Sequence, residues 1–531
     1  PAAAAKGPAS RAPAARRETA ESIGRRQREI SVAEFFQKNR HLLGFDNPAK
    51  ALLTATKEAV DNSLDACEEA GLLPEITVAI EELAEDRFRL AVTDNGPGIV
   101  RAQIPRVFGK LLYGSKFHLL RQSRGQQGIG VSAAGMYAQL TTGQPVRITS
   151  RIAKKKPAHY FELQIDTARN EPKVLTDREV EWDLKHGTKV EMDLAGTYKK
   201  GRRSVDDYIV QTGLANPHAT VHYRPPKGDE YHRERLTREL PRPPVAIKPH
   251  PHGVELGALI SMLRDTKGRT LKTALQSDFS RVSANVAEEI CKAAGLSPER
   301  RPKSLEVGQI EALYRAIPKV RIMAPPANVV VPIGEALILE GLRQAATADF
   351  YTATSRPPAV YRGNPFLVEA GLAWGGPMPA DEPIDLWRFA NRVPLQYQQS
   401  ACAVTRATLT TDWKNYGLQQ SRGALPAGPM ILFVHVASVW VPFTSESKEA
   451  IATYPEIVRE LRLGLQEVGR RLGTYLRHKL RLAEAEKKRS YIESYIPHIG
   501  IALREILGLT EAQEKKVVST LTDTLQRSRT P

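Results

Sequence analysis

The sequence predicts a multidomain α+β protein that ends in a long helix. With 531 residues and about 150 residues per domain, three or four domains are expected. Short β-branched segments alternate with amphipathic helices up to about residue 240 and again from 318 to about 450, whereas residues 250–316 show helical patterns only. From residue 454 a leucine-rich, basic segment continues as one helix. These three observations set the fold class and the order of the domains.

The boundaries follow from changes in composition. Residues 1–21 are rich in Ala, Pro and Arg and show no apolar period, so we expect a disordered tail. A Pro- and Arg-rich linker is expected around residues 237–251. The remaining segments are expected to be an α/β domain at 22–240, a helical domain at 241–317, a second α/β domain at 318–453 and C-terminal helices at 454–531.

The charge and the cysteine content indicate which binding partners and which cellular compartment to expect. The formal net charge is +17 and the pI is about 9.6, which favours a polyanionic partner, nucleic acid first. Cys67, Cys291 and Cys402 are far apart and odd in number, so we expect neither a disulfide framework nor a zinc site but a reducing cytoplasm. No apolar run of about 18 residues occurs, so we expect no membrane span and no signal peptide.

A helix is predicted over Thr56–Ala70, because nothing interrupts it before Gly71. One of its faces is apolar. Glu58, Asn62 and Asp65 share another face at spacings of three and four. Such a polar stripe is either a solvated surface or part of a site, and the stripe alone favours the solvated surface.

Two strands are predicted next, at Ile76–Ile80 and Arg87–Val92. The second strand ends in Asp94-Asn-Gly96-Pro-Gly98. A carboxylate there can accept a hydrogen bond from an exocyclic amino group, and the glycines let a flat ring approach the backbone. Alone, this segment indicates only a turn.

A glycine-rich loop follows, from Arg124 to Ser132, and leads into a predicted helix at Val131–Leu140. Glycine-freed amides at a helix N-terminus make an anion site. The spacing is that of neither a dinucleotide-binding loop nor a P-loop, since no Walker lysine follows. Further strands are predicted at 146–150, 160–165 and 188–194.

The later part of the chain contains three notable segments. The loop Tyr198–Ser204 has four cations around one glycine, and is either a solvated loop or a phosphate contact. Met430–Ser438 is an almost continuous apolar run and predicts a strand buried on both faces. Tyr454–Lys488 is predicted to form one basic helix of roughly 50 Å. Two short helices, broken near Pro497 and Gly508, are expected after it.

Taken together, Glu58 with Asn62, Asp94-x-Gly-x-Gly and Gly125-x-x-Gly-x-Gly, in this order, resemble the GHKL ATPases. This family includes gyrase-type topoisomerases, heat-shock chaperones, MutL mismatch-repair proteins and histidine kinases. The resemblance implies a GHKL (Bergerat) two-layer α/β sandwich that holds ATP under a lid. Glu58 would be the general base, Asn62 the Mg2+ ligand and Asp94 the adenine contact. The other ATP-binding residues implied are Gly96, Gly98, Ser115, Lys116, Gly125, Gln126, Gln127, Gly128, Ile129, Gly130, Val131 and Ser132.

The chain after residue 20 also resembles the B subunits of type IIB DNA topoisomerases, the topoisomerase VI family. The helical insert is similar to a helix–two-turns–helix domain, and residues 318–453 to a transducer domain with Arg388-Phe-Ala-Asn-Arg-Val-Pro-Leu and Ser445-Glu-Ser-Lys-Glu. In such proteins a transducer lysine contacts the γ-phosphate, and Lys448 matches it. Matched residues in the two expected DNA-contact loops are Lys200, Arg202, Arg203, Trp413, Lys414 and Tyr416.

This resemblance implies an ATP-hydrolysing subunit in which ATP closes two copies into a dimer gate, with residues 22–45 as a strap. The long helix would pass the motion to an A subunit that cleaves double-stranded DNA, within an A2B2 heterotetramer at the nucleoid. Relaxation or decatenation of DNA would result. The alternative is another GHKL ATPase, either MutL-like or a heat-shock chaperone, although both lack the helical insert. Asp65 is expected either to belong to the site or to be only a buried hydrogen-bond partner.

Overall fold

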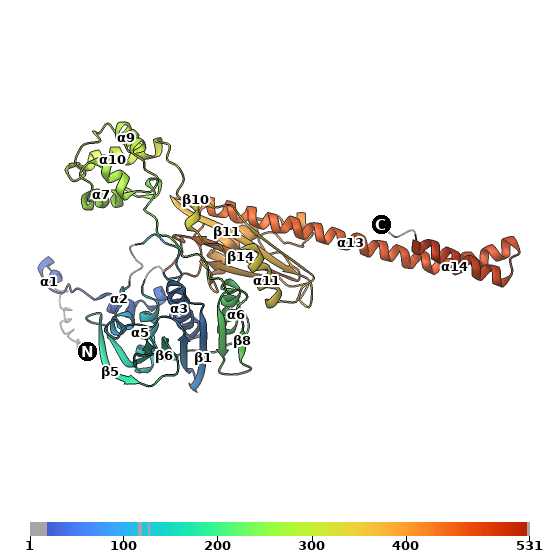
Figure 1. Ribbon diagram of the computed structural model, residues 1–531, viewed down its shortest axis with the longest axis horizontal. Coiled ribbons are helices and arrows are strands. Elements are labelled where there is room, and N and C mark those ends of the chain that lie inside the picture. Colours follow the sequence, from blue (N-terminus) through green and yellow to red (C-terminus); the bar gives the residue numbers. More distant parts are fainter. Residues whose placement is uncertain (1–18, 115–118, 126–127, 528–531) are drawn as a thin grey trace, which may run out of the picture.

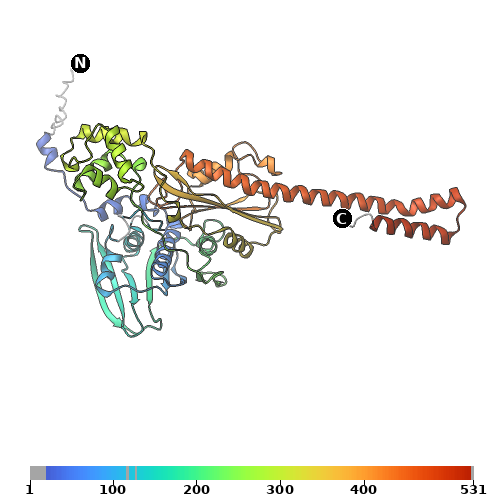
Figure 2. The same ribbon diagram turned by 45° about the horizontal axis from the view of Figure 1, so that its top comes forward.

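The computed structural model describes residues 19–114, 119–125 and 128–527 (Figure 1). A first lobe is built on one β-sheet, a helical lobe stands apart from it, and a second sheet joins the two. From the second sheet the helix α13 (Pro455–Leu507) extends far beyond the rest of the molecule, and α14 (Glu511–Arg527) folds back along it (Figures 1 and 2).

Within the described residues, the first sheet has eight strands in the order β5-β4-β3-β6-β2-β1-β7-β8. Neighbours are antiparallel except β1 and β7, which pair in parallel. Every strand predicted in this part of the chain is confirmed, although the strand predicted at 76–80 is twice as long in the structure. The bounds are β1 Glu75–Ala84, β2 Arg87–Asp94, β3 Val146–Arg151, β4 Ala158–Asp166, β5 Glu171–Val180, β6 Gly187–Ala195, β7 Thr220–Arg224 and β8 Tyr231–Arg233.

Helices cover one face of this sheet, which confirms the two-layer sandwich. Alternate residues of β2, namely Phe88, Leu90 and Val92, are buried beneath them, as the period-two pattern of a half-buried strand requires. The helices of this lobe are α1 Ala20–Gly24, α2 Val32–Lys38, α3 Pro48–Glu69, α4 Ile104–Gly109, α5 Gly130–Thr142 and α6 Val205–Ala215.

The helical lobe is built only of helices and turns in the described residues, as its pattern predicts (Figure 2). Leu259, Leu263 and Leu271, expected as its core, are almost fully buried. Its helices are α7 Leu256–Asp265, α8 Leu271–Asp278, α9 Ala284–Ala293 and α10 Val307–Ala316.

The second sheet runs β10-β11-β14-β12-β13, with β9 paired to β11, and β12 lies parallel to β14. All nine residues of β14 are buried, which confirms a central strand covered on both faces. Helix α11 (Glu335–Ala345) covers one face, while α12 (Ala403–Thr410) and the start of α13 cover the other. The strands are β9 Phe350–Ser355, β10 Ala359–Tyr361, β11 Asn364–Trp374, β12 Asp385–Ala390, β13 Val393–Pro394 and β14 Met430–Ser438.

The prediction for the C-terminal helices is wrong in length. Helix α13 has 53 residues and includes Pro497, so at 1.5 Å per residue it spans about 80 Å. A proline costs one backbone hydrogen bond, but neighbouring packing can offset that loss. Here α14 packs against the same stretch: a Cβ at Gly500 would lie 2.5 Å from Val518, and Arg504 pairs with Glu514 at 2.8 Å. The helix therefore ends only at Gly508, where φ is +65°.

No helix among the described residues is long and apolar enough to cross a membrane.

Candidate functional site

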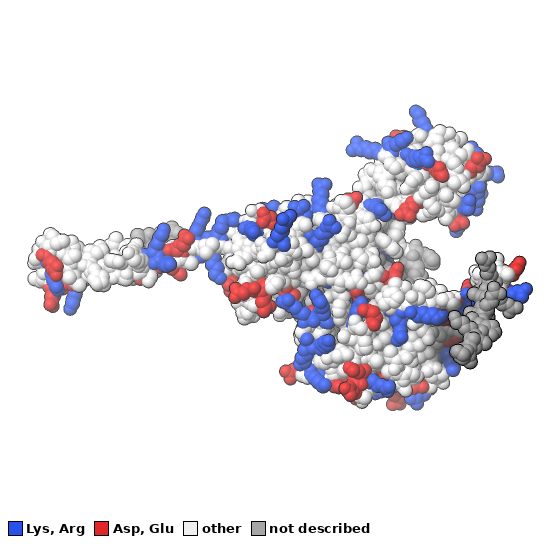
Figure 3. All heavy atoms as spheres, turned by 180° about the vertical axis from the view of Figure 1, so that it is seen from behind, with Lys and Arg blue, Asp and Glu red and all other residues white. Residues whose placement is uncertain are grey.

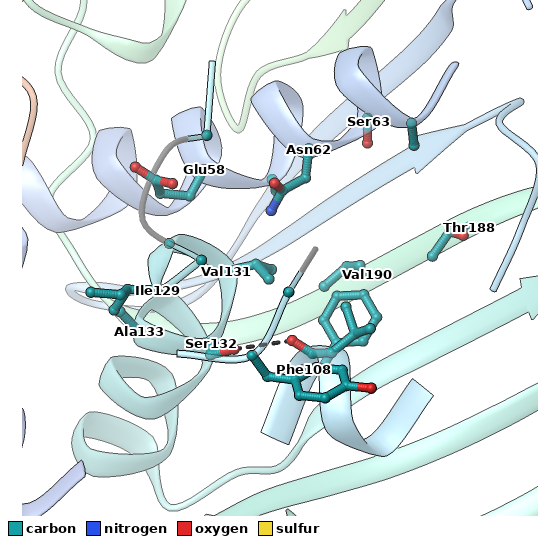
Figure 4. A pocket seen from close by; sticks show the side chains of 18 of the residues that line it. Glu58, Asn62, Ser63, Phe108, Ile129, Val131, Ser132, Ala133, Thr188 and Val190 are labelled. Carbon is teal, nitrogen blue, oxygen red and sulfur yellow. Dashed lines mark hydrogen bonds between the residues drawn. The ribbon is translucent and has the colours of Figure 1, made fainter. Parts of the chain in front are cut away.

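A cavity of about 280 Å³ lies between α3, the first turn of α5 and the loop after β2. A hairpin that follows β14 of the second sheet, Phe443–Ile451, closes one side through Lys448. Figure 4 shows Glu58 and Asn62 projecting from α3 toward Ile129, Val131 and Ala133. The cavity thus brings together residues that are almost 400 positions apart in the sequence.

Helix α3 forms one wall of the cavity. Its N-terminus is capped, and one face is polar while the opposite face is apolar. Asn47 caps it by accepting a hydrogen bond from the Lys50 amide at 2.9 Å, and Pro48 occupies the first turn. The helix begins earlier than predicted, since this cap precedes the apolar repeat. Glu58 is half-buried and Asn62 exposed in the cavity, while the opposite face packs into the core.

Asp94 lies at the end of β2 and is 6% exposed. Its carboxylate accepts hydrogen bonds from the Ser63 hydroxyl at 2.9 Å, the Gly96 amide at 2.9 Å and the Thr188 amide at 3.1 Å. Burial raises the pKa of Asp94, and these three donors oppose that shift. The carboxylate is therefore held in one orientation at the cavity wall.

Gly98 is required at its position. Its φ is +69°, and a Cβ there would lie 2.1 Å from the carbonyl oxygen of Arg151. Any larger residue would be strained in the backbone and would clash with the neighbouring chain. The turn after β2 can therefore lie against the backbone of Arg151 only because this residue is glycine.

The glycine loop meets Glu58 closely at the start of α5. A Cβ on Gly130 would lie 1.7 Å from Oε2 of Glu58, so glycine is what allows the carboxylate to sit over the helix N-terminus. The hydroxyl of Ser132 is already engaged, because it donates to the carbonyl oxygens of Val107 at 3.0 Å and Lys110 at 3.2 Å. The Ser132 hydroxyl is thus not available to a ligand. Its backbone amide is available, because it lies in the first turn of α5, where amides have no partner within the helix.

The hairpin from the second sheet carries Lys448 into the cavity. Lys448 is 6% exposed and has a φ of +52°, and its Nζ donates to the carbonyl oxygen of Arg124 at 3.3 Å. From the other side, Nζ of Lys57 donates to the carbonyl oxygen of Ser447 at 3.4 Å. The hairpin is thereby fastened to the helix that holds Glu58 and Asn62.

Asp65 is an ion-pair partner, in keeping with its expected role as a buried hydrogen-bond partner. Its carboxylate lies 2.7 Å from Arg124, a fully buried cation that also bonds Glu68 at 2.6 Å. Burial alone would raise the pKa of Glu68, but Arg124 and His218 hold it well below its usual range. Neither Arg124 nor Glu68 was predicted as a site residue from the sequence.

A second buried group under α3 was also missed. Asp61 is 4% exposed; one carboxylate oxygen lies 3.3 Å from the Tyr208 hydroxyl, and the other has no hydrogen-bond partner among the described residues. Burial raises its pKa to about 7. Burial likewise lowers the pKa of Lys57, one turn earlier. Neither residue reaches the cavity.

The two loops expected to contact DNA differ from each other. Lys200, Arg202 and Arg203 are exposed at the junction of the two sheets, and Figure 3 shows further basic side chains over the helical lobe. Trp413, in contrast, is fully buried, and its Nε1 donates to the Thr408 carbonyl oxygen at 2.9 Å.

The expectation that the Trp413 side chain contacts DNA is therefore wrong, because a ring inside the core of the second sheet has no surface to offer. Tyr416 is half-buried against Gly469 of α13, and only Lys414 of this loop keeps an exposed cation. Four expected ATP contacts, Ser115, Lys116, Gln126 and Gln127, lie outside the described residues.

Comparison with known proteins agrees with this architecture. Residues 47–192 match the family model "Histidine kinase-, DNA gyrase B-, and HSP90-like ATPase", and residues 325–488 match "Topoisomerase VI B subunit, transducer". The first match begins at the cap of α3 and ends within β6, so the first lobe is a GHKL domain, which binds ATP.

Whole proteins match over most of their length. The B subunit of type 2 DNA topoisomerase 6 from Methanococcoides burtonii is 50% identical over 489 residues, covering 92% of this chain and 79% of the relative. Its counterpart from Archaeoglobus fulgidus is 47% identical, covering 93% and 82%, and that from Natronomonas pharaonis is 35% identical, covering 92% and 84%. The MutL-like and chaperone alternatives are thereby set aside. The chain belongs to the family of topoisomerase VI B subunits, the ATPase subunits of type IIB DNA topoisomerases.

Proposed function

We propose that the cavity binds ATP together with Mg2+, and that hydrolysis there drives the motion of the second sheet. One observation carries the proposal: Glu58 and Asn62 of α3, the N-terminus of α5 and Lys448 all line one cavity. A base, a metal ligand, free amides and a cation are the groups that phosphoryl transfer to water requires.

The phosphates would lie at the N-terminus of α5. The amides of Gly128, Ile129, Gly130, Val131 and Ser132, with Gly125 beside them, would bind phosphate oxygens, and the helix dipole favours the negative charge. Lys448, which now bonds the Arg124 carbonyl oxygen, would turn to the γ-phosphate. Because Lys448 lies on the hairpin that follows β14, this contact would couple nucleotide state to the position of the second sheet.

The adenine would lie against Asp94, Gly96 and Gly98. The carboxylate of Asp94 is oriented by three donors and still has lone pairs with which to accept from an exocyclic amino group. Gly98 lines the same part of the cavity.

A magnesium ion fits Asn62. The carboxamide oxygen faces the glycine loop, since a Cβ on Gly125 would lie 4.0 Å from Oδ1. Mg2+ is bound in such sites by one or two protein oxygens, with phosphates and water supplying the rest. When bound, the ion would neutralise charge on the phosphate oxygens.

Glu58 would accept a proton from the attacking water. Its carboxylate lies directly over Gly130, where the phosphates would end. General-base catalysis of this kind contributes about 10²–10⁴-fold, so Glu58 is the residue on which turnover, as distinct from binding, depends most.

The rest of the chain would connect this cycle to DNA. Lys200, Arg202, Arg203 and Lys414 would contact phosphates of double-stranded DNA without reading its bases. Two copies would dimerise on ATP, with residues 22–45 as a strap, and α13 and α14 would dock an A subunit in an A2B2 heterotetramer. Relaxation or decatenation of DNA would follow.

The test of the ATPase proposal is Glu58→Ala, with Asn62→Ala as its matched variant on the same helix. Glu58→Ala is expected to bind a nonhydrolysable ATP analogue as wild type does and to turn ATP over at least about 100-fold more slowly. Asn62→Ala is expected to lose the Mg2+ dependence of binding instead. Turnover at the wild-type rate in Glu58→Ala removes Glu58 as the base.

The docking proposal is tested on the tail. Ile506 and Leu507 are 76% and 63% exposed, although apolar side chains of this size are more often buried. Ile506→Glu with Leu507→Glu is expected to abolish co-purification with an A subunit while ATP turnover stays unchanged. Retained co-purification contradicts docking at this end of the hairpin.

A further inference from the structure

Three consecutive residues before the glycine loop, 122–124, are each bonded to the second sheet or its flanking loops. The Gln122 carboxamide is 6% exposed; it donates to the Val331 carbonyl oxygen at 3.1 Å and accepts from the Val331 amide at 2.7 Å. The Ser123 carbonyl oxygen accepts from Nδ2 of Asn391 at 3.0 Å. We call residues 122–124 the clamp segment.

The third residue joins the clamp segment to both sides of the cavity. The Arg124 carbonyl oxygen accepts from Lys448 at 3.3 Å. Its guanidinium, 4% exposed, bonds Asp65 and Glu68 on α3, two and three turns beyond Glu58. Since Gly125 follows directly, a shift of Arg124 also moves the start of the glycine loop.

On the second sheet the clamp segment meets a rigid turn. Asn391 and Arg392, between β12 and β13, have φ values of +47° and +68°, as the two central residues of a tight hairpin turn do. The turn is held by bonds to β14: Nδ2 and Oδ1 of Asn391 bond the backbone of Ser438 at 3.0 and 2.9 Å, and the Arg392 amide donates to His435 at 3.0 Å. When the sheet moves, this turn must therefore move together with β14.

We propose that the clamp segment is a second connection, besides Lys448, that couples nucleotide binding to the position of the second sheet. Within it, Arg124 is the residue that positions the start of the glycine loop. The inference rests on the proposed ATP site. If the sheet rotates, the clamp segment either follows it and displaces Gly125 or breaks its hydrogen bonds to Val331 and Asn391. Leaving such buried groups unpaired is costly, so following the sheet is the favoured response.

Hydrogen exchange of the full chain tests this, with and without a nonhydrolysable ATP analogue and Mg2+. In wild type, the analogue is expected to slow exchange in two places, residues 128–142 at the cavity and residues 388–396 at the turn. Gln122→Met keeps the length of the side chain but removes both bonds to Val331. It is expected to retain the slowing at 128–142 within about twofold and to lose most of the slowing at 388–396.

Arg121→Ala is the matched control, because Arg121 is the preceding residue and pairs with Glu69 at the surface, at 2.6 Å. It is expected to behave as wild type in both places. Gln122→Glu, which can still accept from the Val331 amide, serves as a second variant if Gln122→Met fails to fold, and its slowing at 388–396 is expected to fall between the two.

The outcomes separate the two proposals. No slowing at 128–142 in wild type refutes the ATP site itself. Slowing at 128–142 without slowing at 388–396 in wild type, or full slowing at 388–396 in Gln122→Met, refutes the clamp segment alone. Arg124→Lys adds a kinetic check: a loosened glycine loop is expected to raise KM for ATP about tenfold, and an unchanged KM contradicts Arg124 as a positioning residue.

Discussion

Replacing Gly130 by alanine tests how closely the glycine loop and the proposed base depend on each other. Gly130 is the first residue of α5, where alanine is tolerated and even favoured by the helix. The added Cβ would lie 1.7 Å from Oε2 of Glu58, and real Cβ contacts essentially never fall below 3.0 Å. Because this neighbour is the end of a flexible side chain, the carboxylate would give way by more than an ångström while the fold stays intact.

A displacement of that size has a predictable effect on turnover. A misplacement of about 1 Å in a catalytic group costs on the order of 100-fold, or about 2.7 kcal/mol of transition-state stabilisation. We therefore expect Gly130→Ala to lower kcat for ATP about 100-fold, with thermal unfolding close to that of wild type.

A double-mutant cycle decides whether the loss acts through Glu58. Steady-state ATP turnover is measured for wild type, Gly130→Ala, Glu58→Ala and the double variant. If alanine acts by displacing the base, it adds little in the Glu58→Ala background, since the group it displaces is gone. Turnover at the wild-type rate in Gly130→Ala, or a full second loss in the double variant, refutes the reasoning.

Three further predictions concern other parts of the molecule. Burial raises the pKa of Asp61 from 3.8 to about 7, so the folded protein keeps a proton that the unfolded chain releases, and its stability falls as pH rises between those values. The part of that fall that lies between pH 5 and pH 8 is about 2.7 kcal/mol. Asp61→Asn should remove it, as measured by urea unfolding at pH 5 and pH 8; an equal fall in the variant contradicts the assignment. Lys200→Glu with Arg202→Glu should weaken DNA binding and flatten its dependence on salt by about two units of slope; unchanged binding at low and high salt contradicts a phosphate contact. Trp413→Ala should cost about 3–5 kcal/mol of stability, whereas Lys414→Ala should leave stability unchanged and weaken DNA binding; the reverse result contradicts the core position of the indole.

Much of the first lobe could be predicted because its local signals and its tertiary packing agree. The apolar repeat of α3 ends at glycine and the strands alternate. Gly130 stands where the backbone comes close to Glu58, and Gly98 where it comes close to Arg151. Each of these is a short-range property of the chain. The residues of the cavity could be predicted from three such segments, namely α3, the turn after β2 and the glycine loop. Lys448 could be predicted only from the family resemblance.

The features that could not be predicted from the sequence depend on contacts between distant segments. The pairing of Arg124 with Asp65 joins residues 59 positions apart, and no local pattern indicates it. Trp413 has the sequence context of a loop aromatic beside a lysine, yet the packing of α12 and α13 buries it. Helix α13 continues through Pro497 because α14 supports it from outside, which propensity alone does not reveal.

The central claim is that nucleotide binding at the cavity places the γ-phosphate between α5 and the second sheet. A structure of the full chain with a nonhydrolysable ATP analogue and Mg2+ tests it most directly. We predict the γ-phosphate at the amides of Gly128–Ser132, the metal on Asn62, and Nζ of Lys448 moved from the Arg124 carbonyl oxygen to the γ-phosphate. A bound nucleotide with Lys448 still on Arg124, or a metal held without Asn62, would contradict the account.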